Sequence, residues 1–116
     1  GCRMIKIEEA ERTPLKYTVA DRSQIPEEAA KLIEEKKEKE FQMVYQKGED
    51  LYLIKGYGRQ MSGGYSIQVT DLSASVNAVF FETKLIGPTE EVQGGEPSYP
   101  YIVVKTEYRD VPVQFR

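Results

Sequence analysis

A glycine loop between two strand-like segments holds the residues of this chain best suited to recognise another molecule. Met61, Ser62, Gly63, Gly64 and Tyr65 follow a hydrophobic run and precede a segment of alternating residues. Glycine adopts positive φ without steric cost, so we expect a sharp turn with positive φ at Gly63 or Gly64. Tyrosine supplies a large contact area and is enriched in binding patches. The chemistry indicated is recognition, and a plain β-turn with Tyr65 packed beneath it is the alternative.

Further tyrosines accompany this loop. Tyr57 precedes it, and Tyr99, Pro100 and Tyr101 open a later hydrophobic strand. We predict that Ser62, with Tyr65 or Tyr57, presents an exposed patch beside Tyr99 that binds a partner; packing under the turn is the alternative. The remaining tyrosines fall mostly at strand positions and are expected in the core or on a sheet face. They are Tyr17, Tyr45, Tyr52 and Tyr108.

The chain lacks the residues that several catalytic mechanisms need. The chain has no histidine, no tryptophan and one cysteine, so Ser-His-Asp and Cys-His arrangements are excluded within it. One thiol cannot supply the ligands of a Cys/His zinc site. An enzyme in which a carboxylate acts as the base and the tyrosines hold the substrate ranks last among the candidate functions. No pair of acidic residues has a recognisable spacing for that chemistry. We therefore expect a protein that is not an enzyme, with no metal and no cofactor.

Cys2 has two interpretations. The pair Gly1-Cys2 resembles the end of a bacterial lipobox, in which the cysteine becomes the lipidated first residue after the signal peptide is removed. The alternative is an ordinary thiol, because strand-like Met4, Ile5 and Ile7 follow where lipoproteins usually keep a flexible tether. With a single cysteine, no internal disulfide forms and the core alone must stabilise the fold.

Two ordered motifs resemble the PrcB C-terminal domain family. The first is Asp50–Val69, which contains Gly58-Arg-Gln-Met-Ser-Gly-Gly-Tyr-Ser-Ile, similar to the family pattern G-x-x-x-(T/S)-G-G-Y-x-(V/I). The second is Ser98–Lys105, which begins Ser-Tyr-Pro-Tyr. The resemblance covers roughly residues 48–116 and leaves 1–47 without a recognised match. Met61 stands where the family often has Pro or Lys, and this departure affects the loop's partner more than the fold.

The resemblance implies a non-catalytic protein-binding module of an exported bacterial protein. The family's namesake is a lipoprotein associated with a surface protease complex, which it is thought to help assemble or stabilise. The resemblance therefore implies an extracytoplasmic cell-surface lipoprotein, a protease as partner, and binding through Ser62–Tyr65 and Tyr99–Tyr101. The loop also resembles that of the chagasin-like cysteine-protease inhibitors, with residues 59–65 inserted into the active-site cleft. The tryptophan-bearing loop typical of that group is missing.

Composition and charge narrow the partner class. The chain has 116 residues, a formal net charge of −3 and 30% charged residues. No stripe of Lys and Arg is available to neutralise phosphates, so nucleic acid is not expected as a partner. No apolar run approaches the ~18 residues of a membrane span. A lipid on Cys2 would be the one contact with a membrane.

The periodicity predicts one α+β domain over residues 1–116 that is mainly β. A helix is expected over 26–40, because Pro26 suits the first helical position. Glu27 and Glu28 would lie near the positive end of the helix dipole, which stabilises acidic side chains. From Phe41 onward the apolar residues alternate. We expect an antiparallel curled sheet, or a small sandwich or barrel, of about seven strands. Strands are expected at 3–9, 14–20, 41–45, 51–55, 65–70, 75–83, 101–106 and 111–115, with those before the helix joining the same sheet.

The inward positions of these elements form the expected core. They are Leu15, Tyr17, Val19, Leu32, Val44, Leu53, Ile67, Val69, Phe80, Val103 and Phe115. A fully buried Phe80 would cost ~3–5 kcal/mol on truncation to Ala.

Overall fold

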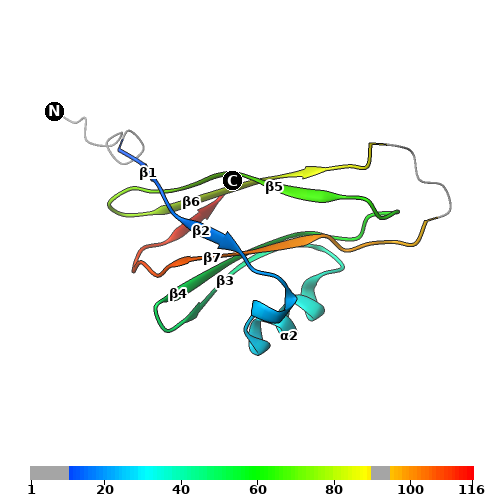
Figure 1. The fold of residues 1–116 in the computed structure, drawn as a ribbon, viewed down its shortest axis with the longest axis horizontal. Helices are drawn as coiled ribbons and strands as arrows, with labels where there is room; N and C mark the ends of the chain where they lie inside the picture. Colours follow the sequence, from blue (N-terminus) through cyan, green and yellow to red (C-terminus); the bar gives the residue numbers. More distant parts are fainter. Residues whose placement is uncertain (1–10, 90–94) are drawn as a thin grey trace.

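Residues 11–89 and 95–116 fold into a sandwich of two four-stranded sheets with one α-helix on its outside (Figure 1). The computed structural model describes residues 11–89 and 95–116. Its elements are β1 (Thr13–Pro14), β2 (Tyr17–Val19), the 3-10 helix η2 (Arg22–Gln24), α2 (Glu27–Lys36), β3 (Glu40–Lys47), β4 (Asp50–Tyr57), β5 (Ser66–Ala74), β6 (Val79–Ile86), β7 (Tyr101–Glu107) and β8 (Val113–Phe115). The expected mainly β, α+β class is confirmed, as a sandwich. The described strands form no closed barrel.

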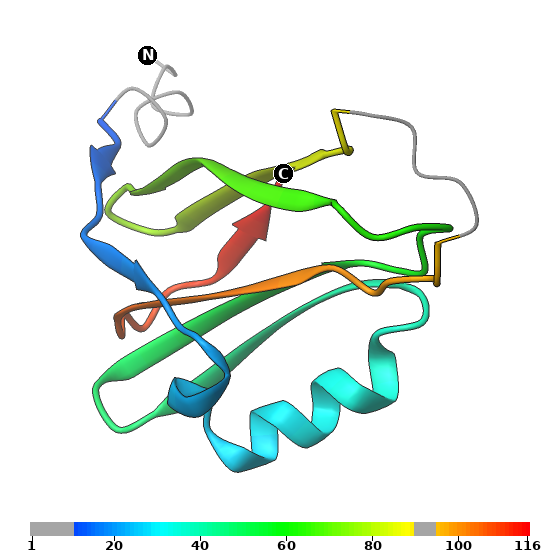
Figure 2. The same ribbon diagram turned by 45° about the vertical axis from the view of Figure 1, so that its right-hand side comes forward.

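The two sheets pack face to face. Sheet A has the strand order β1-β5-β6-β8, and sheet B has the order β2-β7-β4-β3. The described neighbours are antiparallel except β6 and β8, which are parallel. Helix α2 lies on the face of sheet B that points away from sheet A, so the layers are α2, sheet B and sheet A (Figure 2).

Strand β4 is buried on both faces, which accounts for its uninterrupted apolar run. Leu51 and Leu53 join the core between the sheets, whereas Tyr52 and Ile54 join the core under α2. Fully burying one such aliphatic side chain contributes roughly 1.5–3 kcal/mol. The buried core between the sheets also contains Leu72, Ala74, Val79, Phe81, Ile102 and Val104, and the core under α2 contains Ala29, Ile33 and Val103.

Helix α2 begins as expected and ends early. Glu27 and Glu28 lie in its first turn and Lys36 in its last turn, which suits the helix dipole. The expected continuation to Glu40 is wrong, because Glu40 is the first residue of β3. Residues 37–39 offer no apolar side chain for a helix to bury, whereas the strand that follows packs alternate side chains against α2. The buried residues of the helix are Ala29 and Ile33, while Leu32 is exposed, contrary to expectation.

The expected strand over 14–20 is divided between both sheets, so the prediction of one common sheet is wrong. Thr13 and Pro14 pair with β5, and Tyr17–Val19 pair with β7. The crossing is held by Leu15, whose N–H donates to Leu72 O at 3.0 Å and whose side chain packs on the core between the sheets. Tyr17 and Val19 are exposed rather than buried, because β2 is an edge strand. The strand expected at 3–9 lies outside the described residues.

The rest of the core prediction is confirmed in part. Leu53, Phe80 and Val103 are buried, and Leu15, Ile67, Val69 and Phe115 are half-buried. Val44 is exposed on edge strand β3, against the prediction. The strand expected at 75–83 begins only at Val79, since Ser75–Ala78 form the turn between β5 and β6.

Candidate functional site

The two motifs singled out in the sequence meet at one end of the sandwich. The glycine loop (residues 58–65) leaves the end of β4, and the Tyr-Pro segment (residues 98–101) enters the start of β7. Because β4 and β7 are antiparallel neighbours, the end of one lies beside the start of the other. Gln60 and Ser98 exchange two main-chain hydrogen bonds of 2.8 and 3.0 Å, and the Ser98 hydroxyl donates to Ser62 O at 2.6 Å. Figures 1 and 2 both show the segments side by side.

Two glycines give the loop its path. Gly64 has φ +86°, which confirms the expected positive φ, and a Cβ there would lie 3.0 Å from Pro88 Cβ. Gly58 has φ +75°, and a Cβ there would lie 2.9 Å from the main-chain nitrogen of Glu40. Gly63 has no positive φ and free space around it. The sequence interpretation missed the role of Gly58, although a glycine directly after a strand is a recognised turn pattern.

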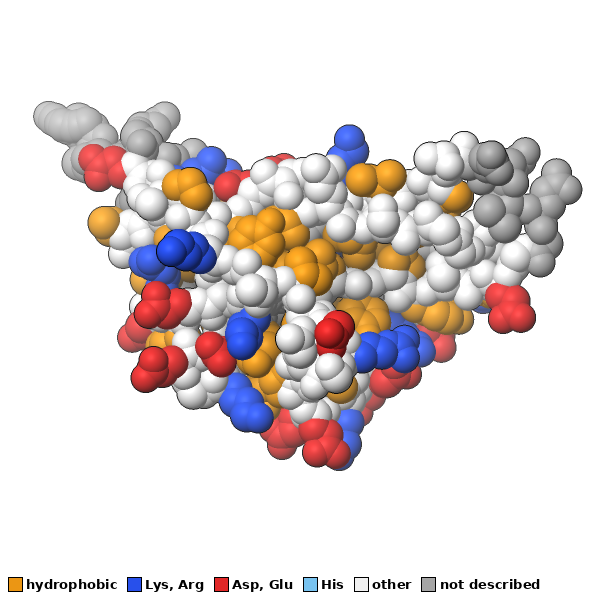
Figure 3. All heavy atoms as spheres, in the orientation of Figure 1, with side chains coloured by type: hydrophobic (Ala, Val, Ile, Leu, Met, Phe, Trp, Pro, Cys, Tyr) orange, Lys and Arg blue, Asp and Glu red, His pale blue; other side chains and the backbone are white. Residues whose placement is uncertain are grey.

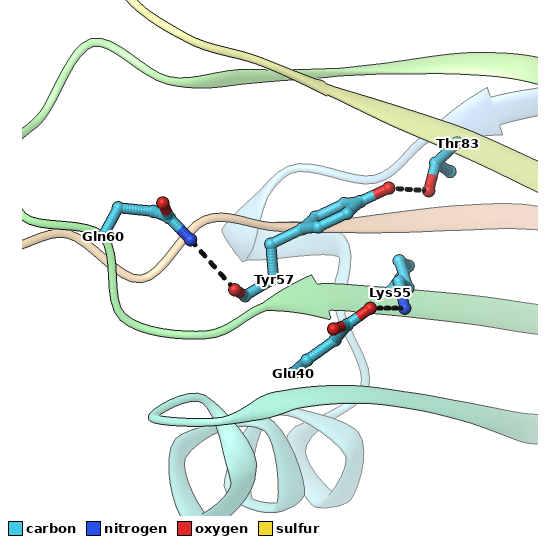
Figure 4. Close-up of polar contacts among 5 residues, drawn as sticks. All are labelled: Glu40, Lys55, Tyr57, Gln60 and Thr83. Carbon is cyan, nitrogen blue, oxygen red and sulfur yellow. Dashed lines mark hydrogen bonds and ion pairs between the residues drawn. The ribbon is translucent and has the colours of Figure 1, made fainter.

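Tyr57 points into the sandwich. Its hydroxyl oxygen lies 2.6 Å from Thr83 Oγ1 on β6, so the side chain bridges sheet B and sheet A (Figure 4). Lys55 Nζ lies 5.2 Å from the Tyr57 ring centroid and pairs with Glu40 at 2.8 Å. Tyr57 O also accepts a hydrogen bond from the Gln60 side chain at 3.0 Å. The ring is half-buried and holds the base of the loop.

Tyr65 and Tyr99 are half-buried and have different neighbours. The Tyr65 ring lies against Gly87, where a Cβ would be 3.5 Å from Tyr65 Cε2. Lys37 Nζ lies 5.2 Å from the Tyr99 ring centroid. Glu34 accepts a hydrogen bond from Lys37 at 2.9 Å, and this bond raises the pKa of Lys37. Lys37 therefore stays charged beside the Tyr99 ring.

An open groove of about 340 Å³ runs beside the Tyr-Pro segment. Tyr99, Pro100 and Tyr101 line it on one side, and the turn that follows β2 lines it on the other. The remaining lining residues are Val19, Ala20, Asp21, Arg22, Ile25, Ile102 and Val103. The space-filling view shows apolar side chains exposed along the line between the two sheets on the face that carries β2 (Figure 3). The lining of the groove itself is mostly apolar and includes the polar side chains of Asp21 and Arg22.

The sequence interpretation did not include the turn that forms the second wall of the groove. Asp21 accepts hydrogen bonds from the N–H and the hydroxyl of Ser23 at 2.9 and 2.6 Å, while Gln24 Oε1 accepts from Asp21 N at 2.9 Å. This capping box shapes η2. The spacing Asp-x-x-Gln indicates such a turn in the sequence, but only the fold brings it against Tyr101.

The predicted site residues thus form two groups. Ser62, Gly63, Gly64 and Tyr65 share the glycine loop with Met61, whose side chain is 75% exposed, and Tyr99–Tyr101 line the groove. Tyr57 is half-buried and directs its hydroxyl between the sheets to Thr83, away from the glycine loop, and Cys2 lies outside the described residues. Within 11–89 and 95–116, no cluster of three or more metal-ligating side chains occurs. No helix in this part of the chain is long and apolar enough to cross a membrane.

Comparison with known families matches residues 51–107 to the PrcB C-terminal family. This segment of the chain is therefore similar to a PrcB C-terminal domain. The matched PrcB C-terminal segment starts at the second residue of β4, ends with β7, and includes both the glycine loop and the Tyr-Pro segment. Helix α2 and strands β1, β2, β3 and β8 lie outside the matched residues. No curated protein and no solved structure matches the chain.

Proposed function

We propose that this chain is a non-catalytic protein-binding module. The observation that carries the proposal is the groove beside Tyr99, Pro100 and Tyr101, adjoined by a glycine loop that Ser98 fastens in place. Aromatic rings with partly exposed apolar faces are typical of protein-binding patches. A loop held by main-chain hydrogen bonds loses little conformational entropy when a partner binds.

The partner we propose is a component of a protease complex, which this chain assembles or stabilises. The support is the match of residues 51–107 to the PrcB C-terminal family, because the matched residues include both parts of the candidate site. The proposal gives the chain no catalytic role, in keeping with a sequence that has no histidine and one cysteine.

We further propose that the protein is exported and anchored at the cell surface through a lipid on Cys2. The support is the Gly1-Cys2 pair together with the family. Mass spectrometry of the natively expressed protein tests this, since a diacylglyceryl group on Cys2 adds a defined mass. A free Cys2 thiol in the native protein would refute the anchor.

Chemical cross-linking in the native cells, followed by purification of this chain, tests the binding role. We expect a protease-complex component to be captured by the parent. The double variant Met61→Ala/Ser62→Ala should capture it at least about tenfold less well with unchanged thermal stability. The matched control is Val76→Ala, an exposed apolar truncation in the β5–β6 turn at the opposite end of the sandwich. If the double variant captures the partner as well as the parent does, the loop is a turn and nothing more.

Protease inhibition is the second candidate, because the Met61 side chain protrudes with 75% of its surface exposed. An inhibitor that inserts residues 59–65 into a cleft should block papain-like proteases at nanomolar concentration. Titration of papain activity with the purified chain distinguishes the two functions. Lack of inhibition at micromolar concentration would eliminate this candidate.

A further inference from the structure

The start of strand β7 has an edge that β2 does not cover. Strand β2 pairs with β7 from Thr106 to Val104, and Ala20 N donates to Val103 O at 2.9 Å. The chain then turns away from β7 into η2. On the edge away from β4, residues 99–102 therefore lie beside the groove and not beside a described strand, whereas on their other edge Tyr101 and Ile102 pair with β4.

The main-chain groups that face this edge belong to Tyr99 and Tyr101. In an antiparallel ladder, successive residues direct their N–H and C=O groups to opposite neighbours. Val103 O faces β2, because it accepts from Ala20, and Pro100 O faces β4, because it accepts from Tyr57 N at 3.0 Å. Tyr99 and Tyr101 therefore face the side that β2 has left. Pro100 has no N–H, but its main-chain groups face β4. The open edge therefore loses no hydrogen-bond donor to this proline.

The groove beside this edge suits an apolar side chain. Tyr101 and Ile25 pack on the core under α2, and Tyr99 lines the groove further along the segment. Strand addition at a sheet edge draws its affinity from main-chain hydrogen bonds and its specificity from pockets for alternate side chains. Unpaired edges also favour such pairing because their polar groups need partners.

The rim of the groove adds a charge preference. Arg22 is exposed, and within the described residues it has no ion pair. Asp21, the acidic residue that lines the groove, is already engaged, since it accepts hydrogen bonds from the N–H and the hydroxyl of Ser23. A carboxylate on a partner would therefore find the Arg22 guanidinium available for a charge-assisted hydrogen bond.

We propose that the open edge of β7 binds an extended segment of a partner protein by strand addition, with an apolar side chain in the groove between Tyr101 and Ile25 and a carboxylate at Arg22. This inference rests on the proposed binding function and names the partner's chemistry. The bound segment alternates apolar and polar residues and carries Asp or Glu.

Selection of a displayed library of random ten-residue peptides against the chain tests the partner's chemistry. We expect enrichment of sequences with alternating apolar residues and an Asp or Glu. A synthetic copy of the best peptide should bind at least tenfold more weakly when its pairing amides are N-methylated. Failure to enrich any sequence, or equal binding after N-methylation of each amide in turn, would overturn the proposal.

Amide hydrogen exchange locates the contact. The N–H of Tyr101 faces the open edge, so its exchange should slow at least tenfold when the peptide binds. The N–H of Ile102 faces β4 and serves as the internal control, with unchanged exchange. Arg22→Glu should weaken peptide binding at least tenfold. The control Lys31→Glu, a charge reversal at an exposed position of α2, should not weaken it. Protection elsewhere with none at Tyr101 would place the peptide on another surface.

Combining these variants with the cross-linking experiment separates the two proposals. If Arg22→Glu captures the protein partner as the parent does and Met61→Ala/Ser62→Ala does not, the binding function stands and the strand addition is refuted. If peptides bind at Tyr101 but no partner is captured from cells, the edge site stands and the proposed role in a protease complex is refuted.

Discussion

Tyr57 and Thr83 place their hydroxyl oxygens 2.6 Å apart, and this hydrogen bond joins the last residue of β4 to β6 in the opposite sheet (Figure 4). The glycine loop starts at the next residue. One end of the loop is therefore fixed to sheet A through Tyr57, while its middle is fixed to the Tyr-Pro segment through Gln60 and Ser98. A binding loop with two such attachments is held on rigid elements, which favours a defined geometry.

Removing the Tyr57 hydroxyl should destabilise the fold while leaving the ring in place. For Tyr57→Phe we expect a loss of about 0.5–1.5 kcal/mol in the free energy of unfolding, the usual net contribution of one hydrogen bond. A urea unfolding series with Tyr57→Phe, Thr83→Val and the double variant measures the coupling between the two hydroxyls. Additive losses would show that the hydroxyls do not interact.

Gly64 and Gly63 provide a matched pair for the loop. Gly64→Ala should destabilise the fold by more than about 1 kcal/mol, because φ is +86° and the new Cβ would press on Pro88. Gly63→Ala should change stability by less than that, because no atom lies within 4 Å of the added carbon. Thermal denaturation of both variants checks the difference. Equal losses would mean that the positive φ at Gly64 carries no cost for alanine.

Part of this fold could be predicted from local pattern. The apolar run Leu51–Ile54 indicates a buried strand, Pro26 followed by two glutamates indicates a helix start, and Gly64 indicates the turn. Each of these follows from the conformational preference or burial of neighbouring residues. They need no knowledge of distant parts of the chain.

Other features depend on tertiary contacts and could not be predicted from periodicity. Residues 14–20 alternate throughout, yet Leu15 directs the chain from one sheet to the other. A register shift between Val69 and Asp71 moves the following residues of β5 by one position, so that Leu72 rather than Asp71 joins the core. The groove was missed for the same reason, because Ile25 and Tyr101 lie far apart in the sequence.

Phe80 should be among the most sensitive positions, although it lies outside the two main cores. Its side chain is 3% exposed, and the guanidinium carbons of Arg12 and Arg116 lie 4.9 and 4.6 Å from its ring centroid. We expect Phe80→Ala to cost ~3–5 kcal/mol through lost burial and lost cation–π contacts. Val76→Ala, at an 81% exposed site of the same hairpin, is the control and should have almost no effect. Thermal denaturation of Phe80→Ala within a degree or two of the parent would show that the two arginines do not cover the ring.

Asp21 should give the groove wall a measurable pH dependence. The hydrogen bond from the Ser23 hydroxyl, with main-chain bonds from Ser23 and Gln24, lowers the pKa of Asp21 despite the opposing effect of burial. Because the folded value lies below the unfolded value of about 3.9, the stabilisation is present above that pH and is lost as pH falls through the lowered folded value. Asp21→Ala should therefore lower the melting temperature at pH 7, and its difference from the parent should shrink below about pH 4. Glu96→Ala, at an exposed position that does not line the groove, is the matched carboxylate control and should follow the parent at every pH. If the difference in melting temperature between Asp21→Ala and the parent is the same at pH 3 and pH 7, the charge of Asp21 does not stabilise the turn that contains Arg22.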